Sequence, residues 1–276
     1  MAKSPMPIIG AMRTDPGLVR ELNEDVVAWI TPQDKNVAAN QGCLALVADG
    51  MGGHAAGEVA SALAAEVVRR VYYDLKGPAP KVLAMAFSEA NRAIVDYAGA
   101  HPECKGMGTT CTVLAFRDDK AWVAHVGDSR AYLLRKDRLM QLTEDQTLVA
   151  QMVREGTITK EEATHSPVQN VILQALGAVN QIKPMIASVG IPLQSGDVLI
   201  LCSDGLFNMV PDTTIADIAG RLPPQEACNA LIEAALAQGG HDNTSLGVFF
   251  VGAEAETKSA TEPTTRRIKL PIEQNR

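Results

Sequence analysis

Apolar runs alternate with polar turn segments along most of the chain. In the N-terminal third, the pattern predicts strands at Val26–Ile30 and Cys43–Ala48. Apolar positions at helical spacing then predict two helices, Ala56–Leu75 and Pro80–Gly99, which the turn sequence KGPAP separates. Because the second helix follows the first without an intervening strand, this part of the chain does not describe alternating parallel βαβ units.

A second group of strands follows at close spacing. We predict these strands at Thr109–Phe116, Ala121–Val126 and Arg130–Arg135. The short polar turns RDDK and GDS connect them and leave no room for a crossover helix. The three strands are therefore expected to form an antiparallel meander.

The segment at about residues 145–196 differs in character from its surroundings. Helical stretches are predicted at Glu144–Glu155 and Val168–Leu176, on either side of the polar, turn-rich sequence GTITKEEATHSP. A strand is predicted at Met185–Gly190. We interpret residues 145–196 as a flap rather than as part of the core.

The remaining elements complete an α+β pattern. They are a strand at Asp197–Cys202, helices at Thr213–Ala219 and Pro224–Gln238, and a last strand at Thr244–Val251. Groups of strands followed by groups of helices indicate antiparallel sheets. Since no repeat or low-complexity block interrupts the pattern, residues 1–252 are expected to form a single domain.

Composition and charge exclude several classes of protein. The net charge is -7 and Lys and Arg are scattered, so no nucleic-acid partner is expected. No run of 18 apolar residues and no secretory signal is found, and we expect a cytoplasmic protein without a membrane partner. The five cysteines are never spaced as C-x-x-C, which argues against zinc and against a disulfide framework.

Residues 253–276 are polar and poor in aromatics, and a disordered C-terminal tail is expected there.

A glycine turn follows the strand that ends at Ala48. Gly50, Gly52 and Ala55 formally satisfy the G-x-G-x-x-A fingerprint of dinucleotide sites. However, the following helix does not return to a parallel strand, and the carboxylate of Asp49 would face the pyrophosphate. The dinucleotide interpretation is therefore rejected.

Carboxylates recur at the ends of the predicted strands. Asp49 and Asp204 each stand at the end of an apolar strand and precede a glycine, while Asp25 and Asp242 stand at or near the start of two others. A single Asp-Gly pair is usually a turn former. Several carboxylates meeting at one point would repel one another unless cations neutralised them, and an all-oxygen set favours Mg²⁺ or Mn²⁺. A pair of such ions clamps the oxygens of a phosphoryl group, which indicates hydrolysis of a phosphate ester.

Ordered motifs identify a family that has these properties. Between Arg13 and Val251 the chain resembles the metal-dependent protein phosphatases of the 2C type, in their bacterial form. The resemblance rests on RELNED, VADGMGGHAAGEVAS, GTTCTVLAF, AHVGDSRAYLLR, LTEDQTLV, LCSDGLFNMV and HDNTSLGVFFV, in that order. Each motif is weak alone, but seven in family order are specific.

The resemblance implies a fold and a metal centre. The expected fold is a two-sheet antiparallel β-sandwich flanked by helices on both faces, with a binuclear Mn²⁺ or Mg²⁺ centre at one end. By the family pattern, Asp49 bridges the two ions, the carbonyl of Gly50 binds one, and Asp204 and Asp242 bind the other. Asp25 would hold metal-bound water.

The resemblance also suggests residues around the two ions. Arg20 falls at the phosphate-binding arginine, and a guanidinium fork suits a phosphate dianion. Asp128 matches the ligand of a third, weaker metal ion in bacterial members. Animal members place their general-acid histidine where this chain has Met51. His54 is the alternative acid, although a purely structural role at the start of the helix is equally open.

The activity implied is hydrolysis of phosphoserine and phosphothreonine in proteins by direct attack of an activated water. No C-x₅-R or D-x-D-x-T/V motif is present to supply a covalent nucleophile. A phosphodiesterase or nuclease is disfavoured by the acidic chain, and an inactive phosphoprotein-binding scaffold by the complete ligand set. The expected partners are phosphorylated proteins and a cognate bacterial Ser/Thr protein kinase, and a monomer is expected.

Overall fold

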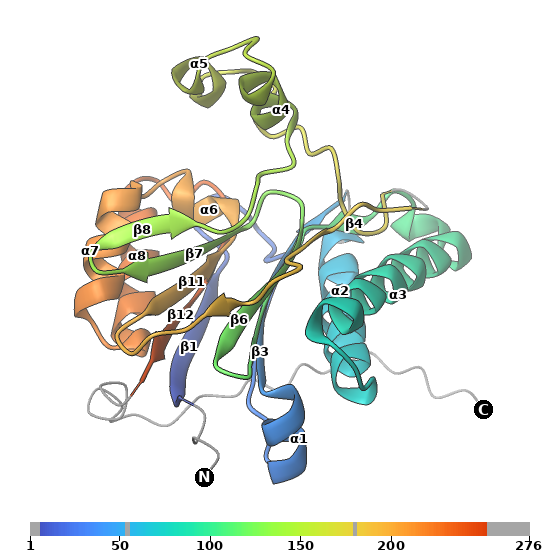
Figure 1. Ribbon diagram of the computed structural model, residues 1–276. Coiled ribbons are helices and arrows are strands. Elements are labelled where there is room, and N and C mark those ends of the chain that lie inside the picture. The colour runs from blue at the N-terminus through green and yellow to red at the C-terminus, as the bar shows by residue number, and fades with distance from the viewer. Residues whose placement is uncertain (1–5, 53–55, 179–180, 253–276) are drawn as a thin grey trace.

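The described strands form two antiparallel sheets that pack face to face, with helices on both outer faces (Figure 1). The computed structural model describes residues 6–52, 56–178 and 181–252. The α+β sandwich predicted from the sequence is confirmed. The predicted tail at residues 253–276 lies outside the described residues.

The first sheet joins the two ends of the described chain. Its strand order is β1-β12-β11-β7-β8, with bounds Ile8–Asp15, Thr244–Val251, Val198–Cys202, Arg130–Arg135 and Arg138–Gln141. β1 pairs with β12 over its full length. β12 therefore lies inside the sheet, although it is the last strand in the described sequence.

The second sheet contains the first two strands of the predicted meander. Its order is β10-β6-β5-β3-β2, with bounds Ile191–Pro192, Lys120–Val126, Cys111–Arg117, Cys43–Met51 and Asp25–Ile30. Two short strands extend it, β4 (Gly108–Thr109) beside β3 and β9 (Met185–Ile186) beside β6. β5 and β6 pair antiparallel across the short turn between them, as the turn length predicted, and β5 also pairs antiparallel with β3.

The third strand predicted for the meander, Arg130–Arg135, is β7 of the first sheet, where it pairs with β11 and β8, so the prediction of a three-stranded meander is wrong. The short turn at Gly127, whose φ is +106°, carries the chain from one sheet to the other instead of forming a hairpin within one sheet.

Helices cover the outer face of each sheet (Figure 1). α2 (Ala56–Asp74) and α3 (Ala79–Ala100) pack on the second sheet, and α7 (Asp212–Arg221) and α8 (Pro224–Ala237) pack on the first. The shorter helices are α1 (Lys35–Gln41), α4 (Leu148–Arg154), α5 (Lys160–Thr164), α6 (Asp204–Phe207) and the 3₁₀ turn Pro102–Cys104. No described helix combines the length and the apolar character needed to span a lipid bilayer.

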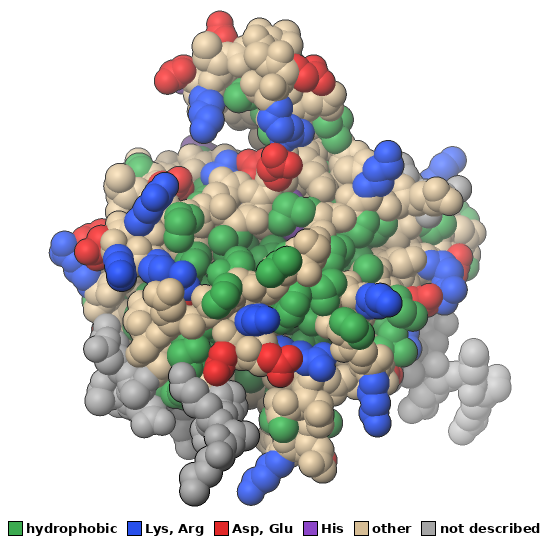
Figure 2. Space-filling view, in the orientation of Figure 1, with side chains coloured by type: hydrophobic (Ala, Val, Ile, Leu, Met, Phe, Trp, Pro, Cys, Tyr) green, Lys and Arg blue, Asp and Glu red, His purple; other side chains and the backbone are tan. Residues whose placement is uncertain are grey.

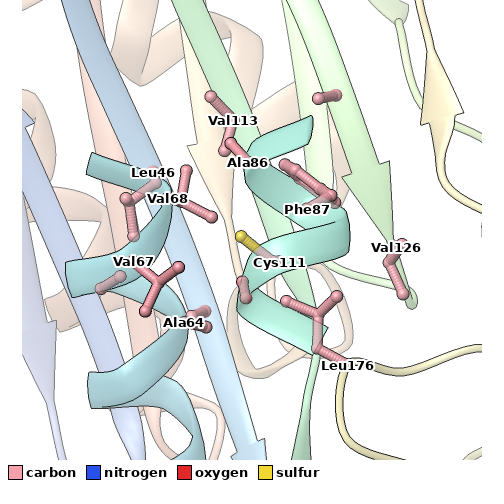
Figure 3. Packing of buried hydrophobic residues seen from close by; sticks show 14 of the residues in the cluster. Leu46, Ala64, Val67, Val68, Ala86, Phe87, Cys111, Val113, Val126 and Leu176 are labelled. Carbon is pink, nitrogen blue, oxygen red and sulfur yellow. The ribbon is translucent and has the colours of Figure 1, made fainter. Parts of the chain in front are cut away.

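Apolar side chains fill the three spaces between these four layers. Between the sheets lie Val47, Leu114, Leu199 and Phe249, which are completely buried. The space between the second sheet and its helices holds another cluster, in which Val68 and Phe87 lie over Leu46 and Val113 (Figure 3). A third cluster fills the space under α7 and α8. The strands are apolar on both faces because each sheet is covered on both sides.

The flap stands away from the two sheets. α4 and α5 project from one end of the sandwich (Figure 1), and on the face seen in Figure 2 hydrophobic side chains gather below them. At its base the flap is a narrow pair of extended segments, since Leu148 N donates to Val171 O at 2.8 Å and Leu173 N donates to Gln146 O at 2.8 Å. The predicted helix at Val168–Leu176 is therefore wrong: tertiary pairing of the backbone overrides its local apolar spacing.

Other boundaries also differ from the sequence-based expectations. Only Met185–Ile186 of the strand predicted at Met185–Gly190 forms a strand, β9, and the helix predicted at Glu144–Glu155 is the shorter α4. The pattern did not predict β1, β8 or α1. None of these three elements has a burial pattern with a clear apolar face, and α1 depends instead on Asp34, whose side chain accepts from the amides of Asn36 and Val37.

Candidate metal centre

The register between β2 and β3 brings two of the predicted aspartates together. Asp25, the first residue of β2, is the direct partner of Asp49 in the antiparallel ladder. Directly opposed residues in such a ladder have their Cβ atoms about 4.5–5.5 Å apart. Asp25 and Asp49 are 24 positions apart in the sequence, and the ladder places their carboxyl groups side by side at one end of the sandwich.

The first sheet supplies the next two aspartates at the same end. Asp204 directly follows Ser203 after β11, and Asp242 lies two residues before β12. The hydroxyl of Ser203 donates to Asp25 Oδ2 at 2.8 Å and accepts from the amide of Ser245 at 3.0 Å. These bonds connect the two sheets where the four aspartates gather.

Two glycines allow the backbone to approach closely around these carboxyls. A Cβ at Gly50 would lie 2.2 Å from the carbonyl oxygen of Gly57 and 2.6 Å from that of Glu24. A Cβ at Gly205 would lie 2.1 Å from the carbonyl oxygen of Asn243. Both positions therefore require glycine, which explains why each strand-end aspartate is followed by one.

The carboxyl groups at this end raise one another's pKa. Burial and then the charges of Asp204 and Asp242 raise the pKa of Asp25 to about 7. Burial and then Asp242 raise the pKa of Asp204 to about 6. Asp49 keeps some accessible surface, yet burial among protein atoms and the charge of Asp25 raise its pKa well above the usual value. These shifts place Asp25, Asp49 and Asp204 within electrostatic reach of one another and of the Asp242 carboxylate.

This arrangement fits hard divalent cations. Within the described ranges, no three His, Cys, Asp or Glu side chains converge tightly enough to form a complete ligand set by themselves. Mg²⁺ usually keeps several waters and uses only one or two protein carboxylates, so a looser carboxylate cluster suits it. Asp25 Oδ1 is buried and has no hydrogen-bond partner among the described residues, which leaves an acceptor for a water or a cation. The described members of the cluster offer oxygen atoms only, which agrees with Mg²⁺ or Mn²⁺ rather than zinc.

Arg20 lies in the loop between β1 and β2, beside the aspartates. Its Nη2 donates to Asp242 Oδ2 at 2.8 Å, and this bond raises the pKa of the guanidinium. Both side chains are partly exposed, Arg20 at 53% and Asp242 at 39%. The predicted phosphate-binding arginine is thus at the site, where it pairs with a predicted metal ligand.

Asn243 holds this loop in place. Its Oδ1 accepts from the amide of Glu24 at 2.8 Å, and its Nδ2 donates to Pro16 O at 3.0 Å and to Leu22 O at 2.9 Å. The side chain is buried and forms these bonds on both sides of Arg20. The position of Arg20 therefore depends on the residue next to Asp242.

Asp128 lies in the tight turn between β6 and β7. Burial and the charge of Asp204 raise its pKa to about 7, which places it in the field of the main cluster. The next residue, Ser129, shares a hydrogen bond of 2.8 Å with the hydroxyl of Thr110, and that hydroxyl accepts from the amide of Asp49 at 3.0 Å. The turn of Asp128 is thus connected to the strand of Asp49 by buried hydroxyl groups.

His125, on β6, has a structural role. It is completely buried, and burial lowers its pKa to about 4, so the ring is neutral. Its Nε2 lies 3.1 Å from the carbonyl of Glu144, which can only accept, so Nε2 carries the proton and Nδ1 accepts from the hydroxyl of Thr112 at 2.8 Å. The ring connects β5 and β6 to the start of the flap.

His54, the alternative general acid, lies outside the described residues. Glu24, which directly precedes Asp25, accepts a hydrogen bond from the amide of Gly57 at the beginning of α2. A carboxylate at this position stabilises a helix N-terminus.

The sequence interpretation missed the serine and threonine residues that support the carboxylates. Ser203 and Ser245 occupy fully buried positions at the ends of apolar strands, and Thr110 and Ser129 are buried beside Asp49 and Asp128. The sequence signal for these residues was a serine or threonine among the apolar residues at the end of a strand. That signal does not predict which carboxyl group each hydroxyl contacts.

Comparison with known proteins agrees with this site and fold. A family model described as protein phosphatase 2C matches residues 21–237. This chain belongs to that family. The predicted family, and with it the prediction of a metal-dependent protein serine/threonine phosphatase, is confirmed.

Individual relatives are bacterial, as the form of the motifs predicted. The serine/threonine phosphatase stp of Listeria innocua is 37% identical over 240 residues, covering 85% of this chain and 92% of that protein. The solved structure of serine/threonine phosphatase Stp1 from Staphylococcus aureus has a TM-score of 0.81 at 29% identity and covers 90% of this chain and 97% of that one. The catalytic domain of PstP, solved in complex with 2 manganese ions, has a TM-score of 0.78 at 38% identity and covers 90% of this chain and 100% of that one.

Proposed function

We propose that this protein removes phosphate from phosphoserine and phosphothreonine side chains of proteins, by direct attack of water at a centre for two Mn²⁺ or Mg²⁺ ions. The observation that carries the proposal is the gathering of Asp25, Asp49 and Asp204 from both sheets at one end of the sandwich. The related catalytic domain of PstP binds two manganese ions, which supports the same cofactor here. Such ions supply a nucleophilic water at neutral pH and neutralise charge on the phosphoryl oxygens.

The proposed ligands follow from the positions of the carboxyls. Asp49 has Asp25, Asp204, Asp128 and Asp242 around it, which suits a residue shared by two ions. We assign Asp204, Asp242 and the carbonyl of Gly50 as further ligands. Asp25 would act through water, because its Oδ2 is already engaged by Ser203 while its Oδ1 has no partner among the described residues.

The remaining residues would act on the phosphate and its surroundings. Arg20 carries several N–H donors on one planar group, so it can bind and orient a phosphoryl oxygen beside Asp242. Asp128 is the proposed ligand of a third cation at the flap side of the centre. His54 remains the candidate that donates a proton to the leaving serine or threonine oxygen.

Several wider features belong to the same proposal. Residues 1–252 are proposed to form one catalytic domain, since the family match from 21 to 237 includes elements of both sheets. Phosphorylated proteins are the substrates, and a bacterial Ser/Thr protein kinase is the proposed opposing enzyme. A monomer located in the cytoplasm is proposed on the basis of the sequence.

The alternative is an inactive scaffold of the same fold that only binds phosphoproteins. Such a protein would tolerate the loss of ligands, whereas here Asp49, Gly50, Asp204 and Asp242 are all present, and Asp204 and Asp242 accept hydrogen bonds from the side chains of Asn208 and Arg20. The structure therefore favours the active enzyme.

The decisive experiment measures release of phosphate from a phosphothreonine peptide. We expect activity with Mn²⁺, no activity with excess chelator, and a loss of at least about a hundredfold in kcat for Asp49→Asn, since a shared ligand affects both ions. Asp137→Asn is the matched control, because Asp137 lies in the β7–β8 turn at a positive φ that Asn also tolerates. Binding of the peptide without hydrolysis, under every metal condition, would support the scaffold instead.

A further inference from the structure

Exposed large apolar side chains are concentrated near the metal centre. Among the described residues, the most exposed are Leu18, Val19, Leu22, Met85, Val171, Leu173 and Val189. Isolated exposed apolar residues are common and need no explanation, but a concentration of them at one site is informative. Five of these seven belong to two short segments that border the centre.

The first segment is the loop that carries Arg20. Leu18, Val19 and Leu22 are 68%, 62% and 51% exposed, and they stand within two residues of the arginine on either side. Their backbone cannot easily turn them inward, because Asn243 binds Leu22 O and Leu18 N donates to Gly240 O at 2.8 Å. The loop therefore holds three apolar side chains in solvent beside the proposed phosphate position.

The second segment is the base of the flap. Val171 and Leu173 are 42% and 39% exposed. Leu173 N donates to Gln146 O, and the Gln146 amide donates in turn to Gly127 O at 2.8 Å, next to Asp128. Gln146 Oε1 also accepts from the amide of Gly127 at 2.9 Å. These bonds attach the second apolar segment to the turn that carries Asp128.

We propose that Leu18, Val19, Leu22, Val171 and Leu173, which we call the apolar rim, bind apolar side chains next to the phosphorylated residue of a substrate protein. A phosphate bound beside Arg20 brings its polypeptide across the two segments that border the site. A phosphorylated segment is favoured over a second copy of the chain, because both parts of the rim adjoin the place where the phosphate must be bound. The inference rests on the proposed function and adds a preference for substrate sequence.

The test compares two phosphothreonine peptides that differ only in the residues on both sides of the phosphothreonine. One peptide has leucines there and the other has serines. Partial burial of leucine side chains should make kcat/KM about tenfold higher for the leucine peptide with the wild-type protein and Mn²⁺. The ratio of the two values is the measured quantity, so general damage to the metal centre cancels.

Two rim variants should reduce this ratio. We expect the double variants Leu18→Ser with Leu22→Ser, and Val171→Ser with Leu173→Ser, each to lower the ratio to about threefold or less. Met85→Ser with Val189→Ser is the matched control, since these residues are 52% and 75% exposed but lie on α3 and between β9 and β10. The control should keep the wild-type ratio.

Three outcomes would overturn the proposal. The first is an unchanged ratio in both rim variants. The second is a wild-type preference for serine peptides, or for a third peptide with flanking lysines. The third is a concentration-dependent dimer in analytical ultracentrifugation that the rim variants abolish while the ratio stays unchanged, which would assign the rim to a second copy of the chain.

Failure of the proposed function would be recognised separately. If no peptide is hydrolysed with Mn²⁺ or Mg²⁺, the phosphatase proposal fails. The rim can then still be judged by fluorescence anisotropy, with the leucine and serine peptides compared for binding. Equal affinity for the leucine and serine peptides would contradict the proposed role of the apolar rim.

Discussion

Asn243 shows how a single side chain can control the neighbouring site. It makes hydrogen bonds to backbone atoms of Pro16, Leu22 and Glu24, and so fixes the loop on both sides of Arg20. An aspartate would have the same shape but no N–H groups. Its carboxylate would face two carbonyl oxygens, which repel it.

We therefore predict that Asn243→Asp weakens substrate binding. The loss of two buried hydrogen bonds costs about 1–3 kcal/mol, part of which should appear as a lower Tm. Because Arg20 loses its fixed position, KM for a phosphothreonine peptide should rise by about tenfold, with a smaller change in kcat. Steady-state kinetics and thermal unfolding measure the two effects.

Asn40→Asp is the control for this change. Asn40 donates to the carbonyl of Asn36 at an exposed position, so its replacement removes a hydrogen bond of little consequence. A normal KM in Asn243→Asp would show that the loop keeps its position without the amide.

At the scale of elements, the ion pair between Arg130 and Asp145 helps to attach the flap to the sandwich. Both Nε and Nη2 of Arg130, the first residue of β7, donate to the carboxylate of Asp145, at 3.0 Å and 2.6 Å. The guanidinium also lies 3.6 Å from the ring centroid of Phe207. The planar group thus makes a bidentate pair and a stacking contact that an ammonium group cannot reproduce.

Arg130→Lys is expected to loosen the flap while leaving the charge unchanged. We predict faster cleavage within residues 148–171 by a protease under native conditions, because the base of the flap opens more often. The KM for a phosphoprotein should rise about threefold or more, an effect expected from the loss of one charged hydrogen bond. Arg92→Lys, at an exposed pair with Glu89, should change neither quantity.

Unchanged proteolysis in Arg130→Lys would mean that the backbone hydrogen bonds of Leu148 and Leu173 hold the flap by themselves. A slower protease reaction in this variant would contradict the prediction outright.

The elements that the sequence predicted well are those with strong local signals. β3, β5, β11 and β12 are continuous apolar runs, and α2 and α3 have clear helical spacing between turns. The stretch Val168–Leu176 has similar apolar spacing, but its amides and carbonyls pair with Gln146, Leu148 and Thr109, which are far away in the sequence. The local pattern of apolar and polar residues cannot predict backbone hydrogen bonds between segments so far apart in the sequence.

The same limit applies to the candidate site. Asp49 and Asp204 could be found because each ends an apolar strand and precedes a glycine. The opposition of Asp25 to Asp49, and the bond from Ser203 to Asp25, depend on register and on the packing of two sheets. Residue types therefore predicted the chemistry, whereas the supporting contacts had to come from the structure.

For the whole molecule, the carboxyl cluster links stability to pH and to metal ions. The pKa values of Asp25 and Asp128 are raised to about 7 and that of Asp204 to about 6, compared with about 4 in an unfolded chain. Between about pH 4 and pH 7 the folded state consequently binds more protons than the unfolded state. The free energy of unfolding of the metal-free protein should therefore fall as the pH rises through this window.

We predict that protein in excess chelator has a lower Tm at pH 8 than at pH 5. Addition of Mn²⁺ at pH 8 should raise the Tm by several degrees or more, because binding to the folded state alone contributes about 2.7 kcal/mol at a concentration one hundred times the Kd. Thermal unfolding across the pH range, with and without metal, measures both effects.

Asp25→Asn offers a direct comparison, since it removes one raised carboxyl without changing the shape of the side chain. In chelator its Tm should depend less on pH than that of the wild type. A wild-type Tm that stays constant or rises between pH 5 and pH 8 in chelator would show that the cluster does not control stability.

The pairing of β1 with β12 has a consequence for synthesis of the protein. Ile8 and Val251 are partners in one ladder, so contacts that close the first sheet span almost the whole described sequence. Contacts of such high sequence separation form slowly and leave strands unpaired in the meantime. During translation, β1 cannot pair with β12 over its full length until residue 251 has emerged from the ribosome. Asp242 and Asn243 arrive in the same late interval, so the proposed ligand Asp242 cannot join the other carboxyl groups until all the strands that precede it in both sheets have been synthesised.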